Sequence, residues 1–171
     1  MNNLSEQFEG IYDKYISKIY RFVYLKVNSQ EIAEDITSKV FMKGWEAFQR
    51  NNGSIENAGA FLYRIARNAV IDHYREKDKN KTVSVDNVPL LADNGTNLQD
   101  LAIIDSELKA VKTAIQSLKK DYQDIIIWHY LEGMKVAEIA GILDKPQGTV
   151  RVMLHRGLQT LKKELSQVQE V

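Results

Sequence analysis

The sequence contains no cysteine, only two prolines and no excess of either charge. The absence of cysteine excludes a disulfide framework, a thiolate zinc site and a cysteine nucleophile. The three histidines lie far apart in the chain, which argues against a histidine metal cluster. Because 23 basic residues balance 23 acidic ones, a uniformly cationic coat for nucleic acid is excluded, although a local basic patch is not.

Long apolar runs and catalytic motifs are missing as well. No stretch approaches the roughly 18 consecutive apolar residues of a membrane span. The first residues, MNNLSEQFEG, are acidic and have no apolar signal core, so we predict a protein that stays in the cytoplasm. The chain has no Walker loop, no GxSxG or HExxH motif and no paired catalytic carboxylates. We therefore predict that it is not an enzyme and that it uses no cofactor or metal.

Helical periodicity covers most of the 171 residues, and no long run alternates with period two. Apolar residues three and four positions apart predict helices over about 8–23, from Asn28 onwards and over 60–77, with 49–59 as a loop rich in Asn and Gly. Asn28 is expected to cap the second helix, with Glu31 as the acid of a capping box. The pattern predicts an all-α fold of two small helical domains.

A break in this pattern divides the chain. Residues 79–104 contain a proline, a glycine and several Asn and Asp, and they carry no sustained apolar stripe, so we predict a flexible linker there. The linker would join a domain over 1–78 to a second domain over 105–171. In the second domain, Asp121 is expected to cap a helix that ends at Gly133.

Two short helices joined by a tight turn form a helix-turn-helix signature over residues 136–155. Ala140 is small enough for close helix approach, and Pro146 suits the start of the second helix, where its missing N–H costs nothing. Residues 145–163 carry five basic side chains and no acid. A plain hairpin with a solvated charged face would share the spacing, but spacing, turn chemistry and one-sided charge together favour DNA binding.

Three segments resemble one family, the extracytoplasmic-function (ECF) sigma factors of bacterial RNA polymerase. Residues 118–165 are similar to the family's promoter-recognition domain. AEDITSKVFMKGW (33–45) resembles its core-polymerase-binding helix, and AFLYRIARNAVIDHYR (60–75) resembles the helix that engages the −10 element. The resemblance implies a sigma factor that binds core polymerase, recognises −10 and −35 elements and initiates transcription of a specific, stress-responsive regulon. It also implies an anti-sigma partner.

The resemblance assigns residues to three interfaces. Polymerase binding is expected of Asp35, Ser38, Phe41 and Trp45. Contact with the single-stranded −10 element is expected of Asn51, Asn52, Asn57, Tyr63, Arg64, Arg67, Asn68, Tyr74 and Arg75. Contact with the duplex −35 element is expected of Lys145, Thr149, Arg151, His155, Arg156 and Lys162. Among the last group, Arg151 is expected to read base edges, because it lies nearer the helix end that enters the groove.

Several of these residues also suit purely structural roles. Four ring side chains would then belong to the core or its rim: Phe41, Tyr63, Tyr74 and His155. Arg64 and Arg67 would form salt bridges within the chain, and the asparagines of 49–59 would build a turn.

A second function fits the same motifs. It is a regulator that binds duplex DNA by itself, with residues 1–78 as a sensor or dimerisation domain. The arginines and aromatic residues of 60–77 favour single-stranded DNA over a sensor pocket. The residues alone identify neither the promoter, the inducing signal nor the anti-sigma factor, and they do not place the two domains relative to each other.

Overall fold

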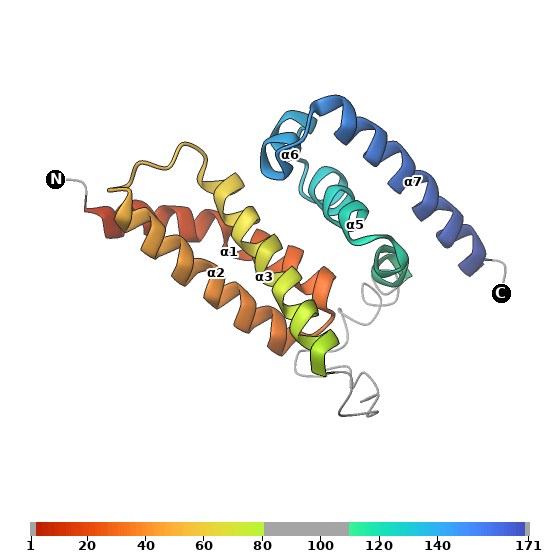
Figure 1. The fold of residues 1–171 in the computed structure, drawn as a ribbon, viewed down its shortest axis with the longest axis horizontal. Helices are drawn as coiled ribbons and strands as arrows, with labels where there is room; N and C mark the ends of the chain where they lie inside the picture. Colours follow the sequence, from red (N-terminus) through yellow and green to blue (C-terminus); the bar gives the residue numbers. More distant parts are fainter. Residues whose placement is uncertain (1–2, 81–109, 170–171) are drawn as a thin grey trace.

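The structure is a computed structural model, and it describes residues 3–80 and 110–169. Every regular element in these two ranges is helical, which confirms the all-α fold class. The first three helices form one bundle, and the later helices form a second bundle beside it (Figure 1). Among the helices of the described ranges, none combines the length and the apolar character that crossing a membrane requires.

The first bundle contains three long helices: α1 (Leu4–Val27), α2 (Gln30–Arg50) and α3 (Ala58–Asn80). The second bundle begins with a helix that includes residues 110–117. It continues through α5 (Lys120–Ile126), the π-helical turn η1 (Ile127–Leu131), α6 (Val136–Leu143) and α7 (Gln147–Gln169). Helices α6 and α7 and the short turn between them form the predicted helix-turn-helix, and Pro146 directly precedes α7.

The boundary between α1 and α2 differs by one residue from the prediction. Asn28 does not cap α2; it ends α1 with a left-handed φ of 56°, and its N–H donates to the carbonyl of Tyr24. Ser29 caps α2 instead, and its hydroxyl oxygen accepts from the N–H of Ile32 at 3.3 Å. Adjacent Asn and Ser each suit a cap, and the left-handed turn falls on Asn because its short polar side chain tolerates that conformation.

Helix α3 is longer than predicted at both ends. It begins at Ala58, where the side chain of Asn57 accepts from the N–H of Ala60 at 3.0 Å, and it continues to Asn80. Residues 79 and 80 are therefore helical rather than part of the linker. The remainder of the predicted linker, 81–104, lies outside the described residues.

Asp121 does not cap α5, contrary to the prediction. The N-cap position is Lys119, which makes no side-chain cap, and Asp121 lies in the first turn. A carboxylate there still interacts favourably with the positive end of the helix dipole. Gly133 has a φ of 68°, as a residue that follows a helix end can.

One apolar core runs through both bundles. At its centre, Trp128 of η1 packs against Phe22 of α1 and Tyr63 of α3, with ring centroids 5.3 and 5.9 Å away. None of these three side chains is more than 1% exposed. Helix α3 also contacts α6. The two bundles thus pack directly on each other, an arrangement that the sequence left open.

Two helical glycines give opposite predictions for an added methyl group. A Cβ at Gly44 of α2 would lie 2.9 Å from Leu62 Cδ2 of α3, whereas a Cβ at Gly10 of α1 would meet nothing within 4 Å. We expect Gly44→Ala to lower the free energy of unfolding by about 0.5–2 kcal/mol, because overpacking against the buried Leu62 outweighs the gain from removing a helical glycine. Gly10→Ala should raise it by about 0.5–1 kcal/mol. Urea titrations measure both changes, and equal gains would contradict the close approach of α2 and α3.

Candidate polymerase and nucleic-acid interfaces

Helix α2 divides into a buried stripe and an exposed face. Val40 and Phe48 are buried, whereas Asp35 and Lys39 are each 62% exposed and form an ion pair at 2.9 Å. Because water and salt screen an exposed pair one turn apart, this pair contributes little to stability. The Asp35 carboxylate can therefore engage a partner at little cost to the fold.

Helices α1 and α2 enclose an apolar groove of about 680 Å³ on the surface of the first bundle. Three of the four residues expected to bind polymerase line it: Ser38, Phe41 and Trp45. Phe41 is 6% exposed and contacts the ring of Tyr12 edge to face, so it is a core residue that also forms part of the groove wall. The groove also presents exposed apolar surface, since Tyr12 is 42% and Met42 is 62% exposed.

The asparagines of the loop between α2 and α3 build the loop itself. The Asn51 side chain donates to the carbonyl of Ala47 at 2.8 Å, and Asn57 caps α3. Asn52 has a left-handed φ of 51°. Ordinary turn chemistry thus accounts for Asn51 and Asn57, while all three side chains remain exposed.

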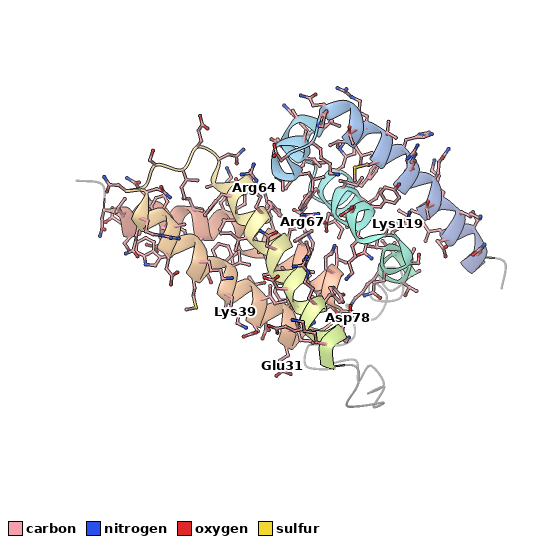
Figure 2. The ribbon with its side chains drawn as sticks, viewed as in Figure 1. Glu31, Lys39, Arg64, Arg67, Asp78 and Lys119 are labelled. Atoms are coloured by element: carbon pink, nitrogen blue, oxygen red, sulfur yellow. The ribbon has the colours of Figure 1, made fainter. Side chains whose placement is uncertain are left out.

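Two of the three arginines of α3, Arg64 and Arg67, bond to the second bundle (Figure 2). Arg67 lies 3.0 Å from Asp124 and 3.2 Å from Asp121. It thus forms salt bridges within the chain, as its structural alternative predicted. Within the described residues Arg64 forms no ion pair with an acid; its guanidinium donates to the carbonyls of Gly141 and Ile142 near the end of α6. In this arrangement both arginines are held by groups of the chain itself.

The two tyrosines of α3 are also engaged. Tyr63 is 1% exposed, and burial raises the pKa of its phenol. Tyr74 is partly buried, its hydroxyl donates to the carbonyl of Lys26, and burial raises its pKa as well. In this arrangement both rings belong to the core or its rim, as their structural alternative predicted. Asn68 and Arg75 remain exposed on α3.

A buried charge cluster joins the bundles, and the sequence analysis missed it. The Lys26 ammonium lies 2.5 Å from the Asp124 carboxylate, and these side chains are only 4% and 2% exposed. Burial raises the pKa of Asp124, although the charges of Lys26 and Arg67 oppose that rise. Lys26 lies three and four residues after the buried Val23 and Phe22. A lysine on an apolar stripe was therefore the signal available in the sequence.

A second ion pair lies nearer the rim of the same interface. Arg21 of α1 donates to both carboxylate oxygens of Glu132, at 2.7 and 2.9 Å. The side chain of Glu132 is 2% exposed, whereas the side chain of Arg21 is 53% exposed. The bidentate geometry fixes the direction in which the end of η1 faces α1.

Helix α7 turns an apolar face inwards and a basic face outwards. Val150 and Leu154 are 0% and 7% exposed and form the seam with the rest of the second bundle. All six residues expected to bind the −35 element are exposed: Lys145, Thr149, Arg151, His155, Arg156 and Lys162. The exposure of His155 excludes its core alternative. In residues 3–80 and 110–169, no three His, Cys, Asp or Glu side chains gather as a metal site requires.

The Lys26–Asp124 pair gives a stability prediction. Lys26→Met leaves a buried carboxylate with Arg67 alone, so we expect the free energy of unfolding to fall by about 3–5 kcal/mol. Adding Asp124→Leu removes the stranded charge and should recover most of that loss, since Arg67 keeps Asp121. Urea titrations of the wild type, both single variants and the double variant measure the coupling. Additive losses would contradict a direct interaction.

Two family models match the chain in order along the sequence. Sigma-70 region 2 matches residues 11–80, and sigma-70 region 4 matches residues 108–161. The first match spans the α1–α2 groove and all of α3, and the second spans the helix-turn-helix.

Curated relatives align along nearly the whole chain. The ECF RNA polymerase sigma factor SigW of Bacillus subtilis is 29% identical, covering 94% of this chain and 89% of SigW. SigM of the same organism is 28% identical, covering 90% and 92%. BldN of Streptomyces coelicolor is 26% identical, and the chain spans only 61% of BldN's length.

Two solved structures share the fold across both bundles. The sigma factor RpoE from Bartonella quintana, in complex with the anti-sigma factor NepR, has a TM-score of 0.72 at 21% identity, over 94% of this chain and 98% of that one. CnrH, in complex with the cytosolic domain of CnrY, has a TM-score of 0.71 at 17% identity, over 96% and 90%. With sigma-70 regions 2 and 4 in their family order and ECF sigma factors aligned along almost the entire sequence, the chain belongs to the ECF sigma factors of bacterial RNA polymerase.

Proposed function

We propose that this sigma factor binds core RNA polymerase in the cytoplasm and directs it to the promoters of a specific, stress-responsive regulon. The observation that carries the proposal is that an exposed groove and an arginine-bearing helix lie inside the matched region 2, while the helix-turn-helix and the first two thirds of an exposed basic helix lie inside the matched region 4. The family is not enzymatic, so polymerase supplies the chemistry. Transcription by core polymerase on total genomic DNA of the source bacterium should start at new positions when the chain is added. Unchanged start positions would overturn the proposal.

The groove of α1 and α2 is the proposed polymerase-docking surface. A partner that covers exposed apolar side chains such as Met42 and Tyr12 removes their surface from water, which stabilises the complex. Glu34 lines the groove, and the exposed Asp35 is the next residue on α2, which favours a partner with basic residues beside its apolar contacts. Ser38 supplies a polar contact within the same surface.

Reversing the charge at Asp35 tests this surface. We expect Asp35→Arg to weaken binding to core polymerase at least tenfold, about 1.4 kcal/mol, while the free energy of unfolding changes by less than about 0.5 kcal/mol. Glu9→Arg, an equal reversal at an exposed position of α1, is the control and should bind like the wild type. Fluorescence anisotropy with labelled chain gives the affinities. If the folded Asp35→Arg variant binds core polymerase as tightly as the wild type, α2 is not part of the interface.

The loop before α3 and α3 itself are the proposed −10 surface. Exposed asparagine amides can hydrogen-bond to base edges, and arginines can neutralise backbone phosphates. Asn52, Asn68 and Arg75 are exposed in the present arrangement. Arg64 and Arg67 are engaged with region 4, so their contact with DNA requires region 4 to withdraw.

The basic face of α7 is the proposed −35 surface. Arg151 and Arg156 are five positions apart, about 500° of rotation on an α-helix, so they point in different directions. Arg151 lies near the N-terminal end of α7, where helix-turn-helix units contact base edges, and its guanidinium donates to Gln147 at 3.3 Å. Arg156 and Lys162 lie further along, where phosphates are the expected partners.

Alanine substitutions separate the two roles. Arg151→Ala should lower discrimination at one or two base pairs by about 1–3 kcal/mol. Arg156→Ala should weaken all sequences alike and reduce the dependence on salt. Binding of the holoenzyme to a promoter library at two salt concentrations measures both effects. If Arg156→Ala alone changes base preference, the roles are reversed; if neither variant alters binding, α7 is not the promoter reader.

An anti-sigma factor is part of the proposed function. The RpoE and CnrH structures that share this fold are complexes, the first with the anti-sigma factor NepR and the second with CnrY. Copurification from the source bacterium, followed by inhibition of the transcription assay, would identify such a partner.

A further inference from the structure

A polar pocket of about 200 Å³ lies where helix α1, the first turn of α3 and region 4 meet. It shares no lining residue with the apolar groove of α1 and α2. Lys14 and Lys18 of α1 line one side, and Glu132 and Glu138 of region 4 line the other. The pocket thus has a cationic wall and an acidic wall, and none of these four residues belongs to the three proposed interfaces.

The cationic wall combines the two lysines with the positive end of a helix. The ammonium groups of Lys14 and Lys18 lie 5.4 and 5.7 Å from the centre of the Tyr15 ring. Among the residues that the structure describes, neither lysine forms an ion pair with an acid. Gly59 of the first turn of α3 lines the same pocket, and the N–H groups of a first turn have no partner within their helix. Such a wall attracts anions.

The hydroxyl of Tyr15 adds a hydrogen-bond donor beside the first turn of α3. A Cβ at Gly59 would lie 2.6 Å from the hydroxyl oxygen of Tyr15, which is closer than two such atoms can approach. Glycine at this position therefore allows the phenol to reach the backbone of α3. Because Tyr15 and Gly59 both line the pocket, the phenol and the helix end contribute to one wall.

Tyr63 contributes a second hydroxyl, which the protein leaves unpaired. Tyr63 lines the pocket and is 1% exposed, and its hydroxyl has no hydrogen-bond partner within the described residues. Burial raises the pKa of Tyr63, the charge of Glu132 raises it further, Arg21 opposes the rise, and Tyr15 adds to it. Since Glu132 and Tyr15 line the pocket, the hydroxyl of Tyr63 lies at its pocket end. Buried hydroxyls are nearly always paired, so this one indicates a ligand that accepts a hydrogen bond.

The acidic wall favours a ligand that also donates hydrogen bonds. Both carboxylate oxygens of Glu132 accept from Arg21, at 2.7 and 2.9 Å, so this negative charge is balanced. Glu138 is exposed, and one of its oxygens accepts from the N–H of Lys135 at 3.1 Å. Carboxylate oxygens have room for further donors such as hydroxyl groups. A ligand that spans the pocket therefore needs an anion at one end and hydroxyl groups at the other.

We propose that this pocket binds a small phosphate monoester that carries free hydroxyl groups. Its phosphate lies between the two lysines, the first turn of α3 and the two phenols, and its hydroxyl groups donate to the glutamates. A phosphate suits this wall better than a carboxylate, because it has more acceptor oxygens for the ammonium, amide and phenol donors. The pocket is bounded on one side by region 4, so a small compound fits it better than a continuous strand. Since both regions supply walls, an occupied pocket favours their packing on each other.

Calorimetry with the full chain tests the site, with glycerol 3-phosphate as the probe. We expect saturable binding of one equivalent, weaker binding of inorganic phosphate and no binding of glycerol. The probe should also raise the midpoint of thermal unfolding, because a ligand that binds only the folded chain stabilises it. If neither phosphate compound binds, the proposal is wrong. Equal affinities for the two would refute the role of the acidic wall.

Matched removals of one hydroxyl test Tyr63. Tyr63→Phe deletes only the unpaired oxygen and keeps the packing of the ring, so we expect a native unfolding midpoint and at least a tenfold loss of affinity for glycerol 3-phosphate. Tyr130→Phe deletes the same atom from a half-exposed residue outside the pocket and should bind the probe like the wild type. A purely structural Tyr63 would leave probe affinity unchanged in Tyr63→Phe, and that result would overturn the proposal.

Paired lysine substitutions test the cationic wall. The double variant Lys14→Gln and Lys18→Gln should lose at least tenfold in affinity for glycerol 3-phosphate and show a weaker dependence on salt. Lys43→Gln with Lys163→Gln removes the same charge from exposed positions of α2 and α7 outside the pocket, and should bind the probe like the wild type. Equal losses in the two double variants would show an effect of net charge alone and would contradict a localised site.

The DNA backbone offers the same phosphate chemistry, and a short single-stranded oligodeoxynucleotide of mixed sequence distinguishes the two sources. We expect the oligonucleotide to bind the Lys14 and Lys18 double variant as tightly as it binds the wild type. If it instead loses as much affinity as glycerol 3-phosphate does, the pocket takes a backbone phosphate and the proposed monoester site is wrong. Either result leaves polymerase-dependent transcription, and hence the proposed function, to be judged by its own assay.

Discussion

The carboxylate of Asp124 is the contact on which the arrangement of the two regions depends. It belongs to region 4, yet its partners are Lys26 of α1 at 2.5 Å and Arg67 of α3 at 3.0 Å, so one side chain fixes two helices of region 2. Burial raises its pKa and the two cations oppose that rise, so the charged form depends on both partners being in place. Apolar residues in such a site often stabilise a protein more than an ion pair does. We therefore expect the cluster to specify how the two regions pack on each other rather than to maximise stability.

The π-helical turn η1 aligns the rest of the interface with Asp124. In an α-helix a spacing of four residues turns a side chain by about 40° from its starting direction. The wider π spacing, seen in the 3.0 Å bond from the N–H of Glu132 to the carbonyl of Ile127, removes much of that drift. Asp124, Trp128 and Glu132 consequently all contact region 2, through Lys26, the Phe22 and Tyr63 rings, and Arg21. A local change in helix type thus determines how two distant segments meet.

The sequence predicted the elements better than their boundaries and their mutual placement. Periodicity located the helices, and turn chemistry with one-sided charge located the helix-turn-helix, because both are local properties of the chain. Because Asn28 and Ser29 are adjacent and can both cap a helix, the N-cap of α2 was predicted at Asn28 but lies at Ser29. Lys26 and Asp124 are 98 positions apart, so no local pattern could pair them, even though a lysine on an apolar stripe signals a buried partner. The engagement of Arg64 and Arg67 followed from that same unpredicted contact.

Two of the three proposed surfaces stay open, while the third is covered in part. The α1–α2 groove and the basic face of α7 remain accessible in this arrangement of the two regions, whereas Tyr63, Arg64 and Arg67 are engaged by region 4. A face that captures single-stranded DNA needs cations beside aromatic rings. In this structure the same cations and aromatic ring instead contact carboxylates, carbonyls and an indole of the chain itself. On the proposed function, contact of Arg64 and Arg67 with the −10 strand therefore requires region 4 to withdraw from α3.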